Sequence, residues 1–214
     1  YWALTDWFDQ EVGRLLDAAH QRSDAENTII IYTSDHGENK GDHGLWWKNC
    51  HYESSARVPL LVSWPAQWTG GQRRSQVCSL LDVVQTIVDL SGGSAPEDWD
   101  GDSLVPLLNN ATSPWKDYAV SEYYAHHIVS GMTMIRKGDW KYIYHNTSEY
   151  DGKAHRELYN LKQDPKEFSN LADHPQHREK LNALHALLVQ ELGEDPEAIE
   201  RRCLQDLKSG YEQE

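Results

Sequence analysis

Residues 28–36 read Thr28-Ile29-Ile30-Ile31-Tyr32-Thr33-Ser34-Asp35-His36, an apolar run that ends in a carboxylate and an imidazole. A β-branched and aromatic run of this length, preceded by a helical pattern, is typical of a strand buried on both faces of a parallel sheet. In open α/β sheets, ligands collect beyond the carboxyl ends of strands because loops converge there. The stretch therefore predicts an α/β fold and a ligand site at the end of this strand.

The sequence on both sides of the run extends this α/β pattern. Residues 4–19 repeat apolar side chains at three- and four-residue steps, which predicts an amphipathic helix. Residues 58–64 form a second candidate for a buried strand. A further helix is predicted to begin at Ser79, with Asp82 as its capping-box partner, and to stop at the Ser-Gly-Gly of residues 91–93. The order helix–strand–loop–strand–helix is typical of α/β layers.

The second half of the chain has the pattern of a small antiparallel sheet followed by helices. Four short strand candidates occupy residues 119–124, 131–136, 140–145 and 156–161. Lys137-Gly138-Asp139 predicts a turn between two of them, so the strands form a meander. A leucine stripe over residues 181–192 and a last helical segment from Asp195 follow. We therefore predict an α/β core over residues 1–115 and a subdomain with an antiparallel sheet and C-terminal helices over residues 116–214.

The charge of the chain excludes two classes of partner. Its 214 residues include 20 Lys and Arg against 34 Asp and Glu, for a net charge of −14. Nucleic-acid binders need a basic face to neutralise phosphates, and polybasic membrane binders need a similar surface. No apolar run approaches the roughly 20 residues of a membrane helix. The sequence begins at Tyr1 rather than at Met, so we expect it to come from a longer or processed polypeptide.

The segment after the first strand carries the candidate chemistry. Asp35 beside His36 suits a divalent cation, and Gly37 would let the backbone turn close to it. A turn cap beside a surface histidine is the alternative for the same pair. Lys48 would supply a point charge for a sulfate or phosphate group. A solvated lysine that follows a packed tryptophan is the alternative for Lys48.

Aromatic and histidine side chains surround Lys48. Trp46 and Trp47 can stack on a sugar ring or a cationic headgroup, although tryptophans more often serve packing. His43 and His51 can line the same pocket, and a structural role is the alternative for each. The spacing of Glu53 and Arg57 predicts a pair that braces the segment.

Several motifs in this chain resemble those of the type I sulfatases in the alkaline phosphatase superfamily. The most specific are residues 32–38 (YTSDHGE), residues 41–46 (GDHGLW) with Lys48, and residues 57–60 (RVPL). Residues 134–142 and 157–167 extend the similarity toward the C-terminus. The arylsulfatase-like and choline-sulfatase-like enzymes are the most similar members.

The resemblance implies hydrolysis of a sulfate ester, with a role for each matching residue. Asp35 and His36 would be the second pair of metal ligands, and Lys48 the catalytic lysine that contacts the sulfate group. We add His51 and Trp47 as substrate-binding residues. The implied metal is Ca²⁺, and the nitrogen ligand of His36 keeps Mn²⁺ and Mg²⁺ as alternatives.

Two parts of the family's site have no counterpart in the chain. The family needs a first pair of acidic ligands and a Cys or Ser in a C/S-x-P-x-R sequence that is oxidised to formylglycine. The chain contains no Asp-Asp doublet, and its nearest sequence to that motif, residues 63–67, lacks the arginine. We therefore expect a C-terminal half that is inactive without a missing N-terminal half. An open sheet edge would also invite homo-oligomers.

Two other functions stay open. A phosphonate monoester or phosphodiester hydrolase of the same superfamily shares the Asp-His and Lys arrangement. A non-catalytic module that binds a sulfated ligand through the aromatic-rich segment is the alternative from another class.

Overall fold

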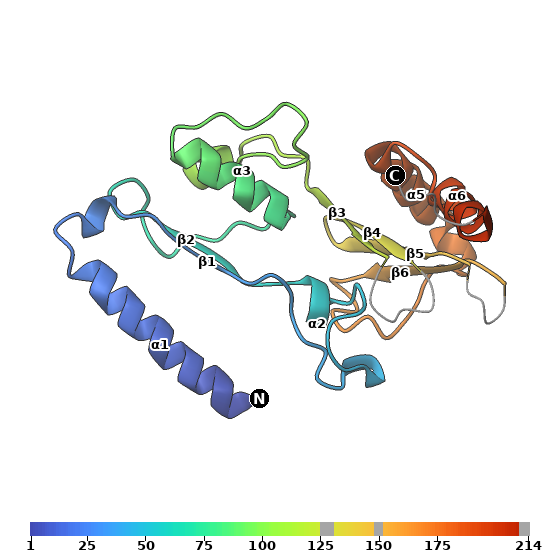
Figure 1. Ribbon diagram of the computed structural model, residues 1–214, viewed down its shortest axis with the longest axis horizontal. Coiled ribbons are helices and arrows are strands. Elements are labelled where there is room, and N and C mark those ends of the chain that lie inside the picture. The colour runs from blue at the N-terminus through green and yellow to red at the C-terminus, as the bar shows by residue number, and fades with distance from the viewer. Residues whose placement is uncertain (125–130, 148–151, 210–214) are drawn as a thin grey trace.

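The computed structural model describes residues 1–124, 131–147 and 152–209, and it contains two sheets (Figure 1). A two-stranded ribbon with its helices lies at one end of the molecule, and a four-stranded sheet with the C-terminal helices lies at the other. None of the described helices combines the length and the apolar character needed to cross a membrane. This mixed α/β architecture agrees with the predicted fold class.

The ribbon corrects the prediction of a parallel, doubly buried sheet. Strands β1 (Ile30–Thr33) and β2 (Leu60–Ser63) pair antiparallel, with Ile30 opposite Ser63. Leu61 remains 59% exposed, so the ribbon is not covered on both faces. An apolar run indicates a tendency to be buried, but it specifies neither the direction of the paired strand nor the element that covers it.

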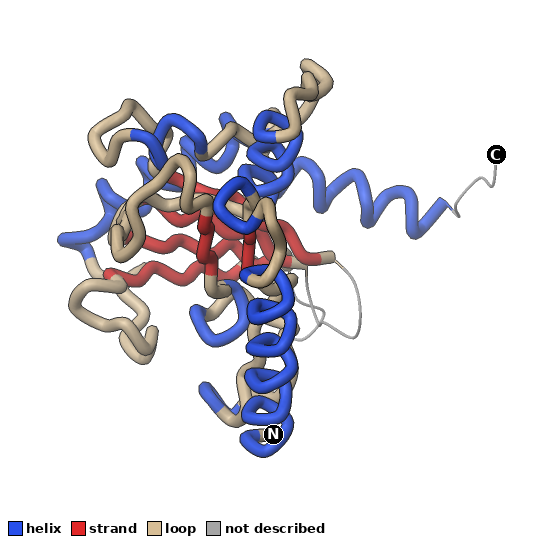
Figure 2. Tube along the Cα trace, turned by 90° about the vertical axis from the view of Figure 1, so that its left-hand side faces the viewer, coloured by secondary structure: helices blue, strands red, loops and turns tan. Residues whose placement is uncertain are grey.

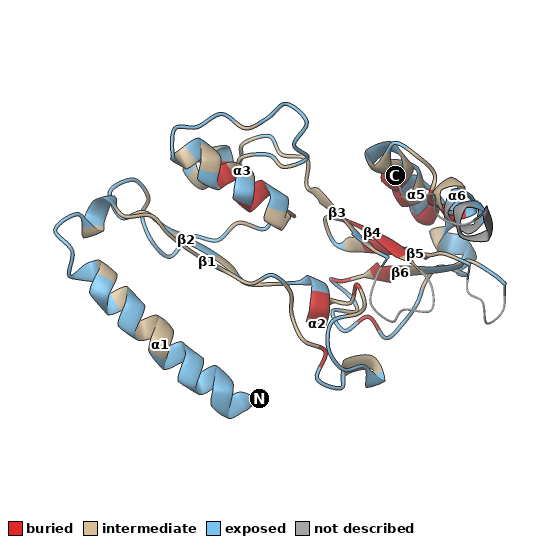
Figure 3. Cartoon of the chain, in the orientation of Figure 1, coloured by how far each residue is buried: buried red, intermediate tan, exposed pale blue. Residues whose placement is uncertain are grey.

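Helix α1 (Trp2–His20) forms where its periodicity predicts, yet its apolar face is not covered. None of its residues is buried, and Trp2, Leu4 and Trp7 are all more than half exposed. Figure 3 shows this helix in the colours of exposed and intermediate residues along its whole length. The amphipathic pattern therefore produces a helix here without producing a packed interface.

Helix α3 (Leu80–Leu90) begins at the predicted capping box and packs beside α4 (Val105–Asn109). The carboxylate of Asp82 accepts the Ser79 backbone N–H at 2.7 Å and forms an ion pair with Lys116 at 2.9 Å. Val83 of α3 forms a small buried cluster with Leu104 and Leu107. The predicted start and end of this helix are confirmed.

The second half forms the predicted antiparallel meander. Its strands follow chain order: β3 (Tyr118–Tyr123), β4 (Met132–Lys137), β5 (Trp140–His145) and β6 (His155–Asn160). Each predicted strand lies within one residue of the observed one. The predicted domain division at residue 115 stays a prediction.

Helix α5 (Arg178–Leu192) supplies the cover for this sheet. Its Leu181, Leu184 and Leu188 pack in one buried cluster with Tyr142 and Leu158 of the sheet. Helix α6 (Pro196–Ser209) follows and projects away from the sheets (Figure 2). The short elements are α2 (Glu53–Ala56) and the 3₁₀ turns η1 (Ala25–Asn27), η2 (Asp42–Gly44) and η3 (Pro175–His177).

Candidate active-site loop

Residues 34–57, here called the candidate loop, make up most of the connection between β1 and β2. The loop leaves the ribbon at the end of β1 and includes η2 and α2. It reaches the four-stranded sheet, where α2 lies beside β6, before it returns to β2 (Figure 1). The loop therefore spans the two parts of the molecule. All five predicted site residues lie on it.

Asp35 and His36 form a corner at the end of β1. His36 Nε2 lies 3.3 Å from Asp35 Oδ2. Asp35 Oδ1 accepts the His36 backbone N–H at 2.9 Å and the Ser34 hydroxyl at 3.2 Å. The His36 N–H is the main cause that lowers the pKa of Asp35. The Asp35 side chain is 82% exposed and the His36 side chain 40% exposed. An ionised oxygen and a ring nitrogen therefore face solvent side by side.

Gly37 holds this corner against the backbone of α2. Its N–H donates to the Ser55 carbonyl at 2.7 Å. A Cβ at this position would lie only 2.1 Å from the Ser54 carbonyl oxygen. Only glycine therefore permits this approach to α2, and the predicted approach of the backbone to a cation stays a prediction.

Polar contacts fold the middle of the loop back on itself. The Asn39 backbone N–H donates to the Trp47 carbonyl at 2.7 Å, and the Trp47 N–H donates to Glu38 Oε1 at 2.6 Å. Asn39 is buried, and its Oδ1 accepts the Ser54 hydroxyl at 2.6 Å. Sequence reasoning missed Asn39, because a single asparagine in a polar stretch gives no sign of burial.

Lys48 and Trp47 lie on the outer side of this fold. The Lys48 carbonyl accepts the Ser55 hydroxyl at 2.7 Å, which fixes its backbone. Its side chain is exposed, and within the described ranges its ammonium group makes no hydrogen bond or ion pair, including with Asp35. Trp47 has a positive φ of 69° and is 67% exposed. Both side chains are accessible, and their roles stay predictions.

His51 lies beneath the loop. It is only 5% exposed, and its Nε2 lies 3.5 Å from the Met132 carbonyl of β4. Burial lowers the pKa of His51 to about 4, with further lowering from the charges of Lys141 and His145. The ring contacts the sheet rather than open solvent, and its substrate-binding role stays a prediction.

His43 is also held by protein contacts. Its ring stacks on Tyr52 with centroids 3.9 Å apart, and its Nε2 lies 2.9 Å from the Lys166 carbonyl. The structural alternative considered for this histidine therefore has direct support.

A buried ion-pair network anchors the loop to the sheet. Lys141 of β5 is fully buried, and its Nζ lies 2.7 Å from Glu53 Oε1 and 2.8 Å from Glu167 Oε1. Nζ also donates to the His51 carbonyl at 2.8 Å, and the Glu53 N–H donates to Glu167 Oε2 at 2.6 Å. The predicted Glu53–Arg57 pair is present at 3.8 Å, but it is the longest of the contacts that Glu53 makes with a cation.

In this network, burial raises the pKa of Glu167, while the adjacent Lys141 lowers it.

Sequence reasoning missed the network. Lys141 and Glu167 lie 88 and 114 residues from Glu53 along the chain. No local pattern connects residues at such separations.

The chain has relatives among known sulfatases. A family model described as "N-sulphoglucosamine sulphohydrolase, C-terminal" matches residues 41–194. A choline-sulfatase from Rhizobium meliloti is 37% identical over 180 residues, which cover 82% of this chain and 33% of the relative. An N-acetylglucosamine-6-O-sulfatase from Bacteroides thetaiotaomicron is 34% identical over 188 residues, with 84% and 33% covered. The chain spans about a third of the length of these curated relatives.

Solved structures of hydrolases superpose on the chain. BT4656, in complex with its substrate D-glucosamine-2-N,6-O-disulfate, superposes with a TM-score of 0.76 at 33% identity, over 85% of this chain and 37% of that one. A phosphonate monoester hydrolase from Agrobacterium radiobacter superposes with a TM-score of 0.74 at 25% identity, over 86% and 39%.

Proposed function

Because the chain belongs to the sulfatase family, whose C-terminal family model matches residues 41–194, we propose that it forms part of a metal-dependent sulfuric ester hydrolase. The observation that carries this proposal is the Asp35–His36 corner, with its oxygen and nitrogen donors 3.3 Å apart at the end of β1. The proposed substrate is a small-molecule or carbohydrate sulfate ester, in line with the choline-sulfatase and N-acetylglucosamine-6-O-sulfatase relatives.

The corner offers a carboxylate oxygen and an imidazole nitrogen, and both are donors that bind divalent cations. The lowered pKa of Asp35 keeps its carboxylate ionised, and the imidazole of His36 adds a nitrogen. Across the part of the chain that the structure describes, no group of three or more His, Cys, Asp or Glu side chains could hold a metal ion. Ca²⁺ takes about six to eight ligands, so Asp35 and His36 would be two of a larger set. We propose Ca²⁺, with Mn²⁺ or Mg²⁺ as alternatives because of the nitrogen ligand.

A segment outside this sequence would supply the remaining ligands and the nucleophile. No C/S-x-P-x-R sequence occurs among the 214 residues. The proposed partner is therefore an N-terminal half of the same enzyme that carries formylglycine. The chain by itself is expected to show no turnover of a sulfate ester.

The residues of the candidate loop have distinct proposed roles. A bound cation would polarise the sulfate oxygens. Lys48 would offset the negative charge that develops on the sulfate group, and its ammonium group is exposed for that contact. Trp47, which is 67% exposed, would pack against the organic part of the ester. The network around Lys141 would hold the loop in place while these groups act.

The test is a chimera in which this chain replaces the matching third of the Rhizobium meliloti choline-sulfatase. The chimera should hydrolyse 4-nitrophenyl sulfate, whereas the chain alone should not. Lys48→Ala should lower kcat/KM by roughly 10²- to 10³-fold, in the range seen when one charge-stabilising group is removed. The matched control is Lys180→Ala, which changes an exposed lysine of α5. Equal activity in the two variants would exclude the proposed role of Lys48.

The phosphonate monoester hydrolase neighbour supports a second candidate reaction. The same chimera, assayed with sulfate, phosphonate and phosphodiester esters, separates the two. A higher kcat/KM for the sulfate ester supports a sulfatase. A higher value for a phosphorus ester supports the alternative. Binding of a sulfated sugar that needs no metal and survives Lys48→Ala, without turnover of any ester, would favour a non-catalytic module.

A further inference from the structure

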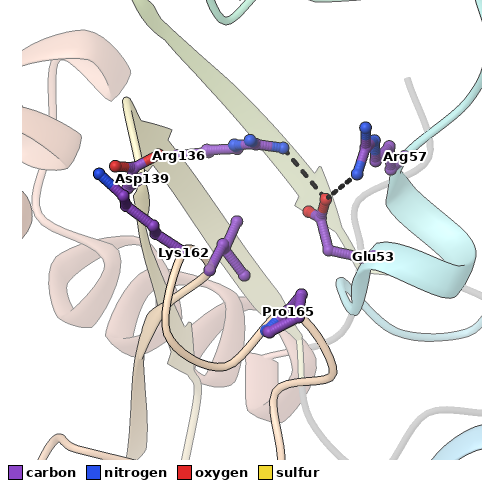
Figure 4. A pocket seen from close by; sticks show the side chains of 7 residues that line it. Glu53, Arg57, Arg136, Asp139, Lys162 and Pro165 are labelled. Atoms are coloured by element: carbon purple, nitrogen blue, oxygen red, sulfur yellow. Dashed lines mark hydrogen bonds and ion pairs between the residues drawn. The ribbon is translucent and has the colours of Figure 1, made fainter.

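A pocket of about 280 Å³ lies between α2 and the turns of the four-stranded sheet (Figure 4). Three segments that are distant in sequence line it: residues 53–57, 136–139 and 161–165. The lining residues are Glu53, Arg57, Arg136, Asp139, Leu161, Lys162 and Pro165. None of the five residues predicted for the hydrolytic site belongs to this lining.

The pocket carries more cationic groups than its carboxylates neutralise. Arg136 Nη1 lies 3.1 Å from Glu53 Oε2, and Arg57 Nη1 lies 3.8 Å from the same oxygen, as the dashed lines in Figure 4 show. The other oxygen of Glu53 pairs with the buried Lys141, whose second partner is Glu167. Glu53 is thus shared among three cations.

Two cationic side chains at the pocket have donors to spare. The Arg57 side chain is 73% exposed, and the 3.8 Å contact with Glu53 is too long for a hydrogen bond. Lys162 lines the same pocket, and no hydrogen bond or ion pair of its ammonium group is found in the described ranges. Asp139 is the second carboxylate of the lining. With Lys141 and Glu167 beneath, four cations face three carboxylates in a chain whose net charge is −14.

Guanidinium and ammonium groups around a small pocket match the chemistry of an oxyanion. A guanidinium presents several N–H donors in one plane, and an ammonium group adds a point charge. Arg136 is held by Glu53 and by the Gly138 carbonyl, which its Nε approaches at 3.3 Å. Within the described part of the chain, the side chains of Arg57 and Lys162 have no such fixed hydrogen bonds. In Figure 4 the Lys162 side chain extends toward Asp139, so it would turn from there to meet a ligand beside Arg57.

We propose that this pocket binds an oxyanion group, with Arg57 and Lys162 as the contacting residues and Arg136 as the fixed cation at its wall. Carboxylate, sulfate and phosphate groups share the required chemistry. None of the predicted hydrolytic residues lines this pocket, so the proposal does not depend on the chain's part in ester hydrolysis.

Isothermal titration calorimetry on the 214-residue chain tests this site. The probes are inorganic sulfate, inorganic phosphate and glucuronate, each added at constant ionic strength because salt screens exposed charges. We expect saturable binding of at least one probe at one site, and the probe that binds most tightly identifies the preferred oxyanion. Absence of saturable binding for all three would overturn the proposal.

Variants locate the binding. Each contact with a charged group that is lost should weaken binding about tenfold or more, so the Arg57→Gln/Lys162→Gln double variant should lose most of the affinity. Arg73→Gln changes an exposed arginine outside the lining and should leave the affinity unchanged. Lys48→Ala should also retain the binding, because Lys48 does not line the pocket. Unchanged affinity in the double variant, or loss of binding in Lys48→Ala, would overturn the assignment.

All of the substituted side chains are exposed, so the variants should fold. Circular dichroism and thermal unfolding check this directly. A fully folded double variant without oxyanion binding supports the site. If the double variant does not fold, Arg57→Lys provides the measurement, since it keeps the charge but loses the planar donors. The proposal then requires weaker binding by that variant, and unchanged affinity overturns it.

Discussion

The four-stranded sheet and the β1–β2 ribbon arise from similar apolar sequences and reach different degrees of burial. In the sheet, Ile135, Tyr142 and Leu158 are completely inaccessible to solvent beneath α5. In the ribbon, Leu61 is 59% exposed, and the neighbouring α1 has no buried residue. An apolar pattern thus determines which side chains favour burial, whereas burial itself needs a second element with a matching face.

The candidate loop joins these two regions, and its contacts show the same contrast. At its start, Asp35 faces solvent at the end of the ribbon. Near its end, Glu53 is fastened to the sheet by the fully buried Lys141. The four-stranded sheet therefore serves as the fixed support of the loop, and the exposed end of the ribbon carries the candidate metal ligands.

The largest expected effect comes from removal of the buried cation that links the regions. Lys141→Met should lower the free energy of unfolding by about 3–5 kcal/mol, because it leaves the carboxylates of Glu53 and Glu167 without their buried partner. Urea unfolding measures this change. Lys180→Met is the control: this lysine of α5 is exposed, its ammonium group lies 5.6 Å from the centre of the Trp140 ring, and its loss should cost no more than about 1 kcal/mol. A loss below about 1 kcal/mol for Lys141→Met would show that the network does not support the loop.

A pair of leucine substitutions tests the contrast in burial directly. Leu188→Ala, at a fully buried position of α5, should cost about 2–5 kcal/mol because it leaves a cavity in the core. Leu15→Ala, at a position of α1 that is 71% exposed, should change stability by no more than about 0.5 kcal/mol. Similar losses for both variants would mean that α1 is covered in solution.

The pH dependence of stability should report the buried position of His51. Its pKa is about 4 in the folded chain, chiefly because of burial, and near 6.5 when exposed. Between these values the unfolded chain binds the extra proton, so stability falls as the pH drops from about 6.5 to about 4. The loss from this group is up to about 3 kcal/mol.

His51→Gln removes this titration and should give a flatter stability profile over the same range. Chemical unfolding at a series of pH values provides the comparison. His20→Gln, at an exposed position of α1, should keep the wild-type slope. A wild-type slope in His51→Gln would show that other groups cause the pH dependence.

The smallest expected effect concerns the contact between the loop and α1. Lys40 Nζ lies 4.1 Å and 4.3 Å from the ring centroids of Trp2 and Tyr1. At an exposed site such contacts contribute about 0.5–1 kcal/mol, so Lys40→Gln should speed amide hydrogen exchange in the first turn of α1 with little change in global stability. Exchange rates equal to the wild type would indicate that other contacts hold this end of the helix.

Much of the fold follows from the sequence because its signals are local. The Lys137-Gly138-Asp139 turn and the alternating strands around it place the meander within one residue. The Ser79 and Asp82 pair marks the start of α3. The carboxylate and imidazole at the end of the first apolar run likewise identify the Asp35–His36 corner, since the strand and its loop are adjacent in the chain.

Tertiary structure alone decided the direction of β2 against β1, the exposure of α1 and the burial of His51. It also decided that Lys141 would meet Glu53 and that three distant segments would form one pocket. Sequence periodicity records the preferences of neighbouring residues, and those preferences determine the elements. Pairings across 80 or more residues depend on which surfaces meet when the chain closes, and no short stretch contains that information.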